Sequence, residues 1–545
     1  MLQHRGRLSI ALATLVTVEA LAACGQVGAA EPPPTPSADW PAYNRTLAGD
    51  RYSPLAEITT ANVGQLALRC AYTLPEVVSF QTGPLVVDGT MYFTTFEGSY
   101  AIDASTCTEK WSRHQRSAGP PGLAVNRGFA YLDGRLYRGT ADAHVIALDA
   151  ANGEVLWDRA LEVQGPGIST PMAPIAANGR VYVGNAGGDT VGVTGHVYAL
   201  DARDGHLLWR FDVVPAHGYA RRTWTNARLP ISGGAFWTSF TLDEAQGILY
   251  VPAGNPAPDF DTLDRTGADL YADSVIAIDA ASGRLLAYHQ LVKRDSHDWD
   301  VDSAPTLATT RSGRKIIASA NKDGLLSILD RSRISRSAVA SDERAPIIPL
   351  LSQTPTTTRE NADAPLSREH AVHFCPGMGG GVEWNGAAYS PRTDSLFTGA
   401  VDLCAKVQIV RELKVPSAGQ VWFGSTGSMA EMIDPSDRAR GWLTAFDAEN
   451  GHVRWKFKAP HPMVAGVTPT GGDLVFGADL GGDIFALDQR NGLVLWQTST
   501  GQSIGGGLVV YRAGGHELLG VATGMKSFAW PGSADKSRIL IYGLR

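Results

Sequence analysis

The densest group of chemically useful side chains in this sequence is a run of four aspartates, Asp295, Asp298, Asp300 and Asp302. Closely spaced carboxylates can take a proton from a substrate hydroxyl or hold a hard cation such as Ca²⁺. A solvated acidic loop has the same composition. The run by itself therefore does not decide between a site and a surface turn.

Two other segments carry oxygen ligands next to turns. Asn255 follows the apolar residues 248–253, which are predicted to form a strand, and Asp189 lies in the glycine-rich residues 187–195. An ordinary turn explains either residue, because Asn and Asp both favour turns. Whether they act with Asp300 depends on the fold that positions them.

An internal repeat predicts that fold. A phrase of eleven residues contains an apolar run and then Asp, and in most copies also a Gly and a final Trp. The apolar run predicts a strand, Asp and Gly bracket a tight turn, and the Trp can pack against the next unit. Copies occupy residues 101–111, 147–157, 199–209, 277–287, 445–455 and 486–496, and a degenerate copy lies at 327–330.

Each copy belongs to a larger unit. An Asp-Gly or Asn-Gly hairpin at residues 85–92, 130–137 and 175–182 precedes the phrase, so each unit is predicted to be a four-stranded antiparallel sheet. Such sheets cannot bury both faces alone and must stack, and a ring of blades leaves only short, protected edges.

The number of units follows from the gaps between copies. Long gaps at 205–277 and 330–445 are expected to contain blades with insertions. We therefore predict an all-β, eight-bladed β-propeller with tryptophan-docking motifs. Residues 538–544 are expected to close the ring by pairing with a strand near the mature N-terminus. A linear β-solenoid is the alternative, although its repeats would be shorter and more regular.

Bulk composition agrees with this fold and bears on the partners. The chain of 545 residues has 60 glycines and 31 prolines, which indicates many turns and little helix. Its formal net charge of −7 argues against a nucleic-acid partner, because phosphate binding needs clustered Lys and Arg.

The N-terminus has the features of an export signal, and we expect a periplasmic location. A short basic start precedes the apolar residues 8–18, which are too few to span a bilayer. Residues 21–24 resemble a bacterial lipobox, in which Cys24 is lipidated, and ordinary cleavage near Ala29 is the alternative. The predicted organisation is a signal peptide at residues 1–24, a flexible linker at 25–38 and one propeller domain at 39–545.

Four cysteines besides Cys24 are expected to form disulfides, because an exported chain lies in an oxidising compartment. Four cysteines allow three connectivities. We favour Cys70–Cys107 and Cys375–Cys404, since each pair closes a local loop. The sequence has no Cys-x-x-Cys-His motif, so no covalently attached haem is expected on it.

The Trp-ended repeat resembles the tryptophan-docking motif of alcohol dehydrogenases that depend on pyrroloquinoline quinone (PQQ). The similarity runs from Asp39 to the C-terminus, so residues 39–545 are expected to bind PQQ. The resemblance implies oxidation of an alcohol to an aldehyde or ketone, with electrons passed to a separate cytochrome c or quinone acceptor.

Two other functions use similar folds. A non-catalytic propeller scaffold of the outer-membrane assembly lipoprotein type shares the repeat and is the main alternative. It predicts no clustered acids at the mouth of the channel. A propeller lyase or hydrolase that acts on carbohydrate is a third alternative.

The resemblance also implies a metal site. Asn255 matches the family's ligand in a Gly-Asn-Pro segment, and Asp189 stands where many members have Glu. Asp300 matches the Asp after Trp that is the catalytic base beside the metal. Asp302 lies two positions later, where members that use lanthanides have an additional carboxylate. The expected ion is therefore Ca²⁺ or a lanthanide, because added negative charge favours a trivalent ion.

The same resemblance assigns cofactor contacts. Trp237 matches an indole that lies under the flat PQQ ring. Arg127 matches an arginine that pairs with a PQQ carboxylate, and Lys322 matches a cation that stabilises the reduced quinone. Three further positions are assigned to the cofactor: Gln81, where the family usually has Glu, and Glu383 and Asn385.

The sequence departs from the family around the cofactor. Pro121 and Gly122 stand where the family has adjacent cysteines that form a disulfide ring over PQQ. Pro171 and Ala186 replace hydroxyl side chains that usually touch PQQ. These changes indicate a divergent substrate or weaker cofactor binding, and methanol is not the expected substrate.

Overall fold

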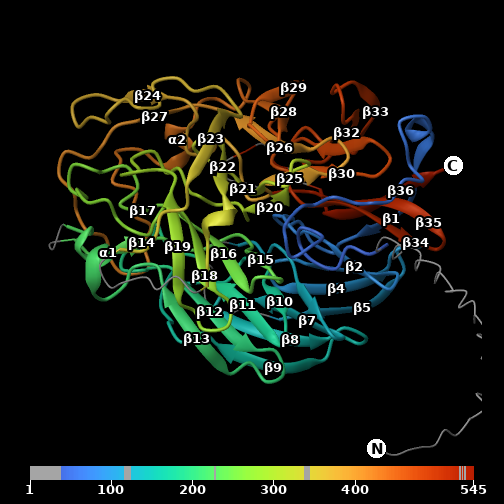
Figure 1. Cartoon of the computed structure of the whole chain (residues 1–545), viewed down its shortest axis with the longest axis horizontal. Helices are drawn as coiled ribbons and strands as arrows, with labels where there is room; N and C mark the ends of the chain where they lie inside the picture. The colour runs from blue at the N-terminus through green and yellow to red at the C-terminus, as the bar shows by residue number, and fades with distance from the viewer. Residues whose placement is uncertain are drawn as a thin grey trace, which may run out of the picture. The chain divides into compact units, whose positions relative to one another are not determined.

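The computed structural model describes residues 38–115, 124–225, 229–336, 344–526, 530, 532 and 535–545. The predicted signal peptide with Cys24, the linker up to residue 37, and Pro121 and Gly122 lie outside these residues. Within the described residues, eight four-stranded antiparallel sheets follow one another around a ring (Figure 1). The predicted all-β, eight-bladed propeller is therefore confirmed.

The blades share one design, in which the first strand is innermost and buried and the fourth is outermost and largely exposed. The first four blades are β2 (Leu85–Val87), β3 (Thr90–Thr94), β4 (Gly98–Asp103) and β5 (Glu109–His114); β6 (Ala130–Leu132), β7 (Arg135–Gly139), β8 (His144–Asp149) and β9 (Val155–Ala160); β10 (Ile175–Ala177), β11 (Arg180–Gly184), β12 (His196–Asp201) and β13 (Leu207–Asp212); and β15 (Thr241–Asp243), β16 (Ile248–Ala253), β18 (Ser274–Asp279) and β19 (Leu285–Gln290). The other four are β20 (Thr306–Thr309), β21 (Lys315–Ala320), β22 (Leu325–Asp330) and β23 (Leu350–Pro355); β25 (Ala387–Ser390), β26 (Ser395–Asp402), β28 (Arg440–Asp447) and β29 (Val453–Ala459); β30 (Thr468–Pro469), β31 (Leu474–Ala478), β32 (Asp483–Asp488) and β33 (Val494–Ser499); and β34 (Leu508–Ala513), β35 (His516–Thr523), β36 (Arg538–Leu544) and β1 (Leu66–Thr73).

The repeated tryptophans hold neighbouring blades together. Nε1 of Trp111 donates to the carbonyl of Ala150 in the next blade at 3.0 Å. A Cβ added to Gly153 would lie 2.7 Å from the Trp111 ring, and this glycine has a φ of +74°. Gly is therefore needed at this turn both for its backbone conformation and for the close approach of the indole. The same Trp-to-carbonyl bond recurs at Trp157–Ala202, Trp209–Ala280 and Trp455–Gln489.

The ring closes where the sequence predicted. β1 pairs antiparallel with β36, from Leu66 opposite Leu544 to Thr73 opposite Arg538. Figure 1 shows this closure at its right, with β1 beside β36, β35 and β34. The disulfide Cys70–Cys107 ties β1 to the turn that follows β4 of the first blade, which is the pairing favoured from the sequence.

The two long gaps in the repeat contain insertions. The first includes α1 (Gly218–Arg222) and the two-stranded sheet of β14 (Ser232–Gly233) and β17 (Pro256–Ala257), and the second includes the sheet of β24 (Val372–Phe374) and β27 (Ala405–Val407), followed by α2 (Met429–Met432). The disulfide Cys375–Cys404, also favoured from the sequence, joins β24 to β27. Two 3₁₀ turns complete the elements, η1 (Val63–Gln65) and η2 (Arg331–Arg333). Across the described part of the chain, no helix has the length and apolar character needed to cross a membrane.

Residues 40–53 run along the inner strands and occupy the centre of the ring. Their backbone groups bond to five blades: Trp40 to Val86, Leu47 to Leu242, Ala48 to Leu307, Asp50 to Tyr389 and Ser53 to Pro469. The segment thus fills part of the channel that eight blades would otherwise leave open.

Candidate active site

The predicted site residues lie in loops at one end of the blades. In each blade the inner strand is antiparallel to the second strand, so the loop before the former and the loop after the latter open at the same end. Asn255 follows β16 and Lys322 follows β21, whereas Trp237 precedes β15 and Glu383 precedes β25. The topology therefore gathers residues that are far apart in the sequence.

The Asp300 carboxylate is fixed from three sides. Its Oδ1 accepts hydrogen bonds from the backbone N–H of Asn255 at 3.0 Å and from Nε1 of Trp237 at 3.4 Å. Its Oδ2 accepts from Nζ of Lys322 at 2.9 Å. A side chain at Gly254 would collide with Asp300, so the glycine before Asn255 allows this approach.

The residues around Asp300 alternate between two environments. His297 stacks on Trp299, with ring centroids 4.3 Å apart, and both lie against Phe374. The carboxylates of Asp298 and Asp300, on alternate positions, both accept from Lys322. One face of the loop is therefore apolar and the other acidic.

Asp295, the first acid of the run, does not share this role. Its two carboxylate oxygens accept hydrogen bonds from the backbone N–H groups of His297 and Trp299, each at 3.0 Å. This is the turn-forming use of aspartate. Asp295 therefore shapes the loop that carries the other three acids.

Three acids from three loops form a close group. Asp189, Asp259 and Asp298 each offer a carboxylate oxygen, and these oxygens all lie within 4.8 Å of one another. The Asn255 side chain lies next to Asp189. We call Asp189, Asp259, Asp298 and Asp300 the acid cluster. The four-residue metal set predicted from the sequence overlaps this cluster, but the closest trio includes two aspartates outside that set.

Burial makes the acid cluster costly when it is charged. Asp259 is fully buried, and neither of its carboxylate oxygens has a hydrogen-bond partner among the described residues. Burial and the nearby Asp189 and Asp298 raise the pKa of Asp259 well above its usual range. Burial and Asp300 raise the pKa of Asp189 to about 6. Lys322 pairs only with Asp298 and Asp300, so Asp189 and Asp259 lack the paired cation that buried carboxylates need.

Arg127 forms a second group with Gln81 and two tryptophans. Its guanidinium donates to the Gln81 side chain and to the backbone carbonyl of Trp237, each at 2.7 Å. It lies 4.8 Å from the centroid of the Trp237 ring and 5.1 Å from that of Trp384. Trp237 therefore joins this group to Asp300. The backbone N–H of Arg127 donates to the carbonyl of Pro171, one of the positions that depart from the family.

Asp302 and Glu383 lie between the two groups. Both are buried, and neither oxygen of Asp302 has a partner among the described residues. Burial and the nearby Glu383 raise the pKa of Asp302 well above its usual range. Burial also raises the pKa of Glu383 to about 7, although Lys322 and Arg127 partly oppose this shift.

Asn385 faces away from the acid cluster. Its Oδ1 accepts from the hydroxyl of Tyr43 at 3.1 Å, and its Nδ2 donates to the carbonyl of Val464 at 2.8 Å. These partners belong to the central N-terminal segment and to the loop before β30. Its predicted contact with the cofactor stays a prediction.

A long segment of the second insertion supports two of the acid-bearing loops. The backbone N–H of Trp422 donates to the carbonyl of Asp189 at 2.6 Å, and the N–H of Phe260 donates to the carbonyl of Phe423 at 2.9 Å. The insertion therefore positions the loops of Asp189 and Asp259 together, although all three segments are distant in the sequence.

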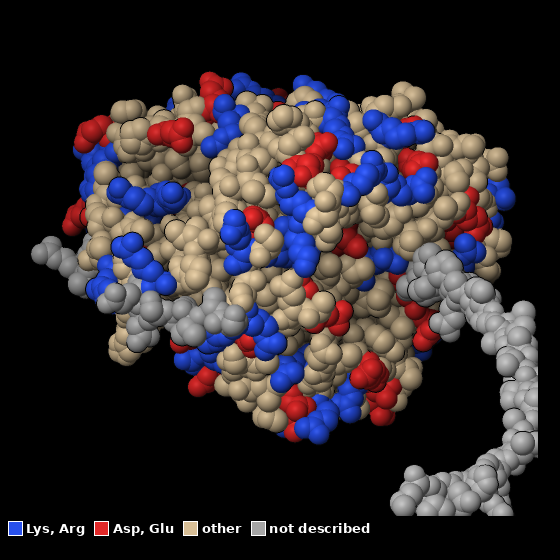
Figure 2. All heavy atoms as spheres, viewed as in Figure 1, with Lys and Arg blue, Asp and Glu red and all other residues tan. Residues whose placement is uncertain are grey.

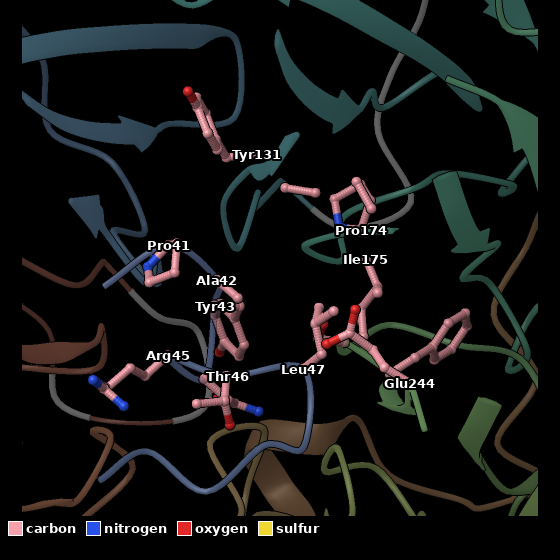
Figure 3. Close-up of a pocket in the computed structure, with 15 residues that line it drawn as sticks. Pro41, Ala42, Tyr43, Arg45, Thr46, Leu47, Tyr131, Pro174, Ile175 and Glu244 are labelled. Carbon is pink, nitrogen blue, oxygen red and sulfur yellow. The ribbon is translucent and has the colours of Figure 1, made fainter. Parts of the chain in front are cut away.

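The acid cluster does not line the cavity that lies beside the N-terminal segment. On the face seen in Figure 2, basic and acidic side chains are interspersed. A cavity of about 310 Å³ lies between the N-terminal segment and the inner strands, where Tyr43, Arg45, Tyr131 and Glu244 are among its lining residues (Figure 3). None of the predicted site residues is among the described residues that line it.

Sequence reasoning missed Asp259, Asp298 and Trp384. Asp259 lies four positions after Asn255, and Asp298 lies two positions before Asp300. The alternation of acids at 298, 300 and 302 was a signal for a shared acidic face. Asp298 also has a φ of +61°, a conformation that residues other than glycine rarely adopt and that clusters at functional sites.

Several proteins that resemble this chain in sequence or fold are named as alcohol dehydrogenases. A quinohemoprotein alcohol dehydrogenase, ADH IIB of Pseudomonas putida, is 28% identical over 541 residues, covering 93% of this chain and 77% of that protein. The quinoprotein alcohol dehydrogenase PedH of Pseudomonas putida is 26% identical and covers 88% of this chain and 84% of its own length. The structure of a europium-containing methanol dehydrogenase shares the fold, with a TM-score of 0.80 and 22% identity over 93% of this chain and 98% of that chain.

Family models match two parts of the chain. The model described as outer membrane protein assembly factor BamB matches residues 439–530. The model described as glucose/ethanol/alcohol dehydrogenase, β-propeller domain, matches residues 40–333, which include the loops of the acid cluster. Because this second match spans more than half of the chain, the protein belongs to the glucose/ethanol/alcohol dehydrogenase β-propeller family.

Proposed function

We propose that this chain oxidises an alcohol to an aldehyde or ketone with PQQ and a hard cation, and that Asp300 is the catalytic base. The observation that carries the proposal is the environment of Asp300. Its carboxylate is held by Asn255, Trp237 and Lys322 at the border between the acid cluster and the Arg127 group. A base must be fixed within hydrogen-bond reach of the proton that it takes.

The acid cluster fits a cation. Its oxygens come from Asp189, Asp259 and Asp298, and Asn255 adds an amide next to Asp189. Carboxylate and amide oxygens are the ligands that Ca²⁺ and similar hard ions take. Asp302, whose buried oxygens have no partner among the described residues, stays a predicted ligand on the far side of Asp300.

The Arg127 group fits a planar, anionic cofactor. The buried Arg127 guanidinium bonds to neutral acceptors, and no carboxylate lies within hydrogen-bond distance of it among the described residues. A ligand carboxylate can supply that partner. The indole of Trp237, which is partly exposed, offers a flat apolar surface beside it. When bound, PQQ would supply the acceptor for the hydride that leaves the alcohol, and this hydride carries both electrons of the oxidation.

The chain's own residues handle the proton. We infer that Asp300 accepts the proton of the alcohol hydroxyl on its carboxylate. Lys322 donates to Asp300 and to Asp298, which keeps the Asp300 carboxylate oriented. Burial alone lowers the pKa of Lys322, but Asp298 and Asp300 raise it well above its usual range, so this ammonium stays charged. Trp299 and Phe374 pack against one face of the loop that carries Asp300 and shield that face from water.

The scaffold alternative does not account for the acid cluster. It predicts no clustered acids at the mouth of the channel, and a scaffold gains nothing from buried carboxylates without partners. The BamB-type model matches only residues 439–530, which lie outside every acid-bearing loop. The dehydrogenase explains both the cluster and its position beside Trp237.

Reconstitution tests the function directly. Purified protein loaded with PQQ and either Ca²⁺ or La³⁺ should reduce an artificial electron-accepting dye when it is given a panel of alcohols, and the quinone absorbance should remain after gel filtration. A sample without PQQ is the control. Dye reduction in neither metal, together with no retained quinone, would rule out the dehydrogenase in favour of the scaffold.

We further propose that the chain is exported and acts in the periplasm, with residues 1–24 as the signal, 25–38 as a linker and 39–545 as the catalytic domain. Electrons would leave through a separate cytochrome c or a quinone. Two processing routes differ in product: lipidation at Cys24 or cleavage near Ala29. Labelling with a fatty acid, compared between the wild type and Cys24→Ser, distinguishes them.

A further inference from the structure

We propose that Asp259 and Asp298 are direct ligands of the cation, which they hold together with Asp189, and that this trio gives the site a preference for a trivalent ion. The inference rests on the proposed function and deepens it. The sequence assigned the cation to Asp189, Asn255, Asp300 and Asp302, and neither Asp259 nor Asp298 belonged to that set.

The three carboxylates lie close enough together to share one ion. Hard cations bind oxygens at about 2.3–2.6 Å, so two oxygens on one ion lie at most about 5 Å apart. The carboxylate oxygens of Asp189, Asp259 and Asp298 all lie within 4.8 Å of one another. One ion can therefore touch all three without a movement of the backbone.

The carboxylate of Asp259 has no hydrogen-bond partner within the described part of the chain. Both its oxygens are buried and have no hydrogen-bond donor among the described residues. The nearby cation Arg265 instead pairs with the carboxylate of Asp269 at 2.7 Å and otherwise reaches backbone carbonyls, among them those of Pro258, at 3.2 Å, and of Asp259, at 3.3 Å. A buried, unpaired carboxylate is strongly unfavourable, and a bound cation removes that cost.

The carboxylates of the acid cluster outnumber the cations that pair with them. Among the described residues, Lys322 is the one cation within hydrogen-bond distance of these carboxylate oxygens, and it divides its donors between Asp298 and Asp300. When all four carboxylates are ionised around a bound cation, they share one ammonium, which leaves three negative charges for the cation to neutralise. A trivalent ion neutralises that charge, whereas a divalent ion leaves part of it buried, and the ligand charge sets hard-cation affinity.

A direct binding measurement tests the assignment without PQQ or alcohol. Full-length protein stripped of metal is titrated with Tb³⁺, and luminescence sensitised by tryptophan is recorded, since Trp299 and Trp422 flank the acid-bearing loops. Asp259→Asn and Asp298→Asn should each weaken Tb³⁺ binding about tenfold or more, because each removes a charged ligand. La³⁺ should displace Tb³⁺ at far lower concentration than Ca²⁺ does.

The matched control is Asp261→Asn. Asp261 is a fully buried acid on the same loop as Asp259, but it pairs with Arg368 at 3.3 Å and lies outside the trio. It should leave the Tb³⁺ affinity within about twofold of the wild type, so a loss equal to that of Asp259→Asn would mean loop damage and overturn the assignment. If Asp259→Asn does not fold, Asp298→Asn carries the test.

Two results would overturn the proposal. Wild-type Tb³⁺ affinity in both Asp259→Asn and Asp298→Asn would exclude them as ligands, and equal displacement by La³⁺ and Ca²⁺ would exclude the trivalent preference. Failure of the proposed function looks different, because Tb³⁺ binding would still depend on the trio while no alcohol reduced the dye.

Discussion

Aspartates occupy two opposite environments in this protein. In the outer turns of the repeat, Asp103 accepts hydrogen bonds from the backbone N–H groups of Ser105 and Thr106, each at 2.9 Å. Hydrogen bonds, the largest from the Ser105 side chain, lower the pKa of Asp103 to about 2. In the acid cluster, Asp259 has no partner among the described residues, and burial raises its pKa well above the usual range.

This difference in hydrogen bonding distinguishes aspartates that stabilise turns of the fold from aspartates that are positioned to bind a ligand. An outer-turn aspartate finds its partners within three residues along the chain, so its charge is stabilised as soon as the turn forms. The carboxylate of Asp259, in contrast, has no donor among the described residues and lies near acids from distant loops. The fold therefore places negative charge where a cation can bind, whereas the outer turns pair each aspartate with nearby backbone N–H groups.

The largest expected effect is a loss of turnover, and it comes from a substitution in the acid cluster. Asp300→Ala should lower turnover by about 10²–10⁴-fold, because it removes the base, while leaving the outer turns untouched. PQQ binding, followed by quinone absorbance, should be largely retained. Steady-state dye reduction with the reconstituted enzyme measures the change. Retention of more than a tenth of wild-type turnover would contradict the role of Asp300.

The second largest expected effect is on the free energy of unfolding, and it comes from a substitution in the outer part of a blade. Trp157→Ala should lower the free energy of unfolding by about 3–5 kcal/mol, since it removes a large buried side chain and the bond to Ala202. Activity per folded molecule should not change. Trp157→Phe is the matched control and should cost less. Thermal unfolding together with turnover measures both, and a loss of turnover at unchanged stability would break the comparison.

A third prediction concerns pH and metal removal. The folded-state pKa values of Asp189, at about 6, and of Glu383, at about 7, lie above those of the unfolded chain. Groups with raised carboxyl pKa values favour the folded state below about pH 4 and lose that contribution as the pH rises through 6 and 7. The metal-free protein should therefore lose stability from pH 4 to 7.5. La³⁺ should suppress this loss, and a Tm series with and without La³⁺ that showed no difference would contradict it.

The smallest expected effect is on the stability of an outer turn, and its dependence on pH is opposite to that of the metal-free acid cluster. Asp103→Ala should cost about 1 kcal/mol or less at neutral pH, because the turn is largely exposed and its hydrogen bonds compete with water. The folded pKa of Asp103 lies below its usual value, so its contribution is present above about pH 4 and is lost as the pH falls toward 2. Asp103→Asn keeps an acceptor and is the control. A destabilisation by Asp103→Ala that did not fade toward pH 2 in chemical denaturation would contradict this assignment.

The propeller could be predicted because the residues that determine each blade lie within one repeat of the sequence. The Asp and Gly of the turn, the apolar strand and the final Trp all act within one blade or between sequence neighbours, as in the bond from Trp111 to Ala150. Even the closing pair of β1 and β36 followed from the need to complete the ring. The copy that ends in Ala287 shows the limit, since the next blade joins there through backbone bonds between Tyr288 and the loop of Pro346 and Ile348.

The site could be predicted only in part. The family pattern selected Asn255, Asp300 and Lys322, which the structure brings into direct contact. It also selected Asn385, whose side chain accepts from Tyr43 of the N-terminal segment and whose contact with the cofactor stays a prediction. No local pattern indicated Asp259, because its importance arises from the approach of the Asp189 and Asp298 loops.

The sequence by itself determined the architecture: the number of blades, the turns, the docking tryptophans and the disulfide pairs. These depend on interactions that are short in sequence or repeated at a fixed period. Only the tertiary structure decided which acids share one site, because the distances among Asp189, Asp259 and Asp298 depend on loops of three blades and on the insertion that supports them. Electrostatic energy depends on those distances and on burial, and neither can be read from the order of residues along the chain.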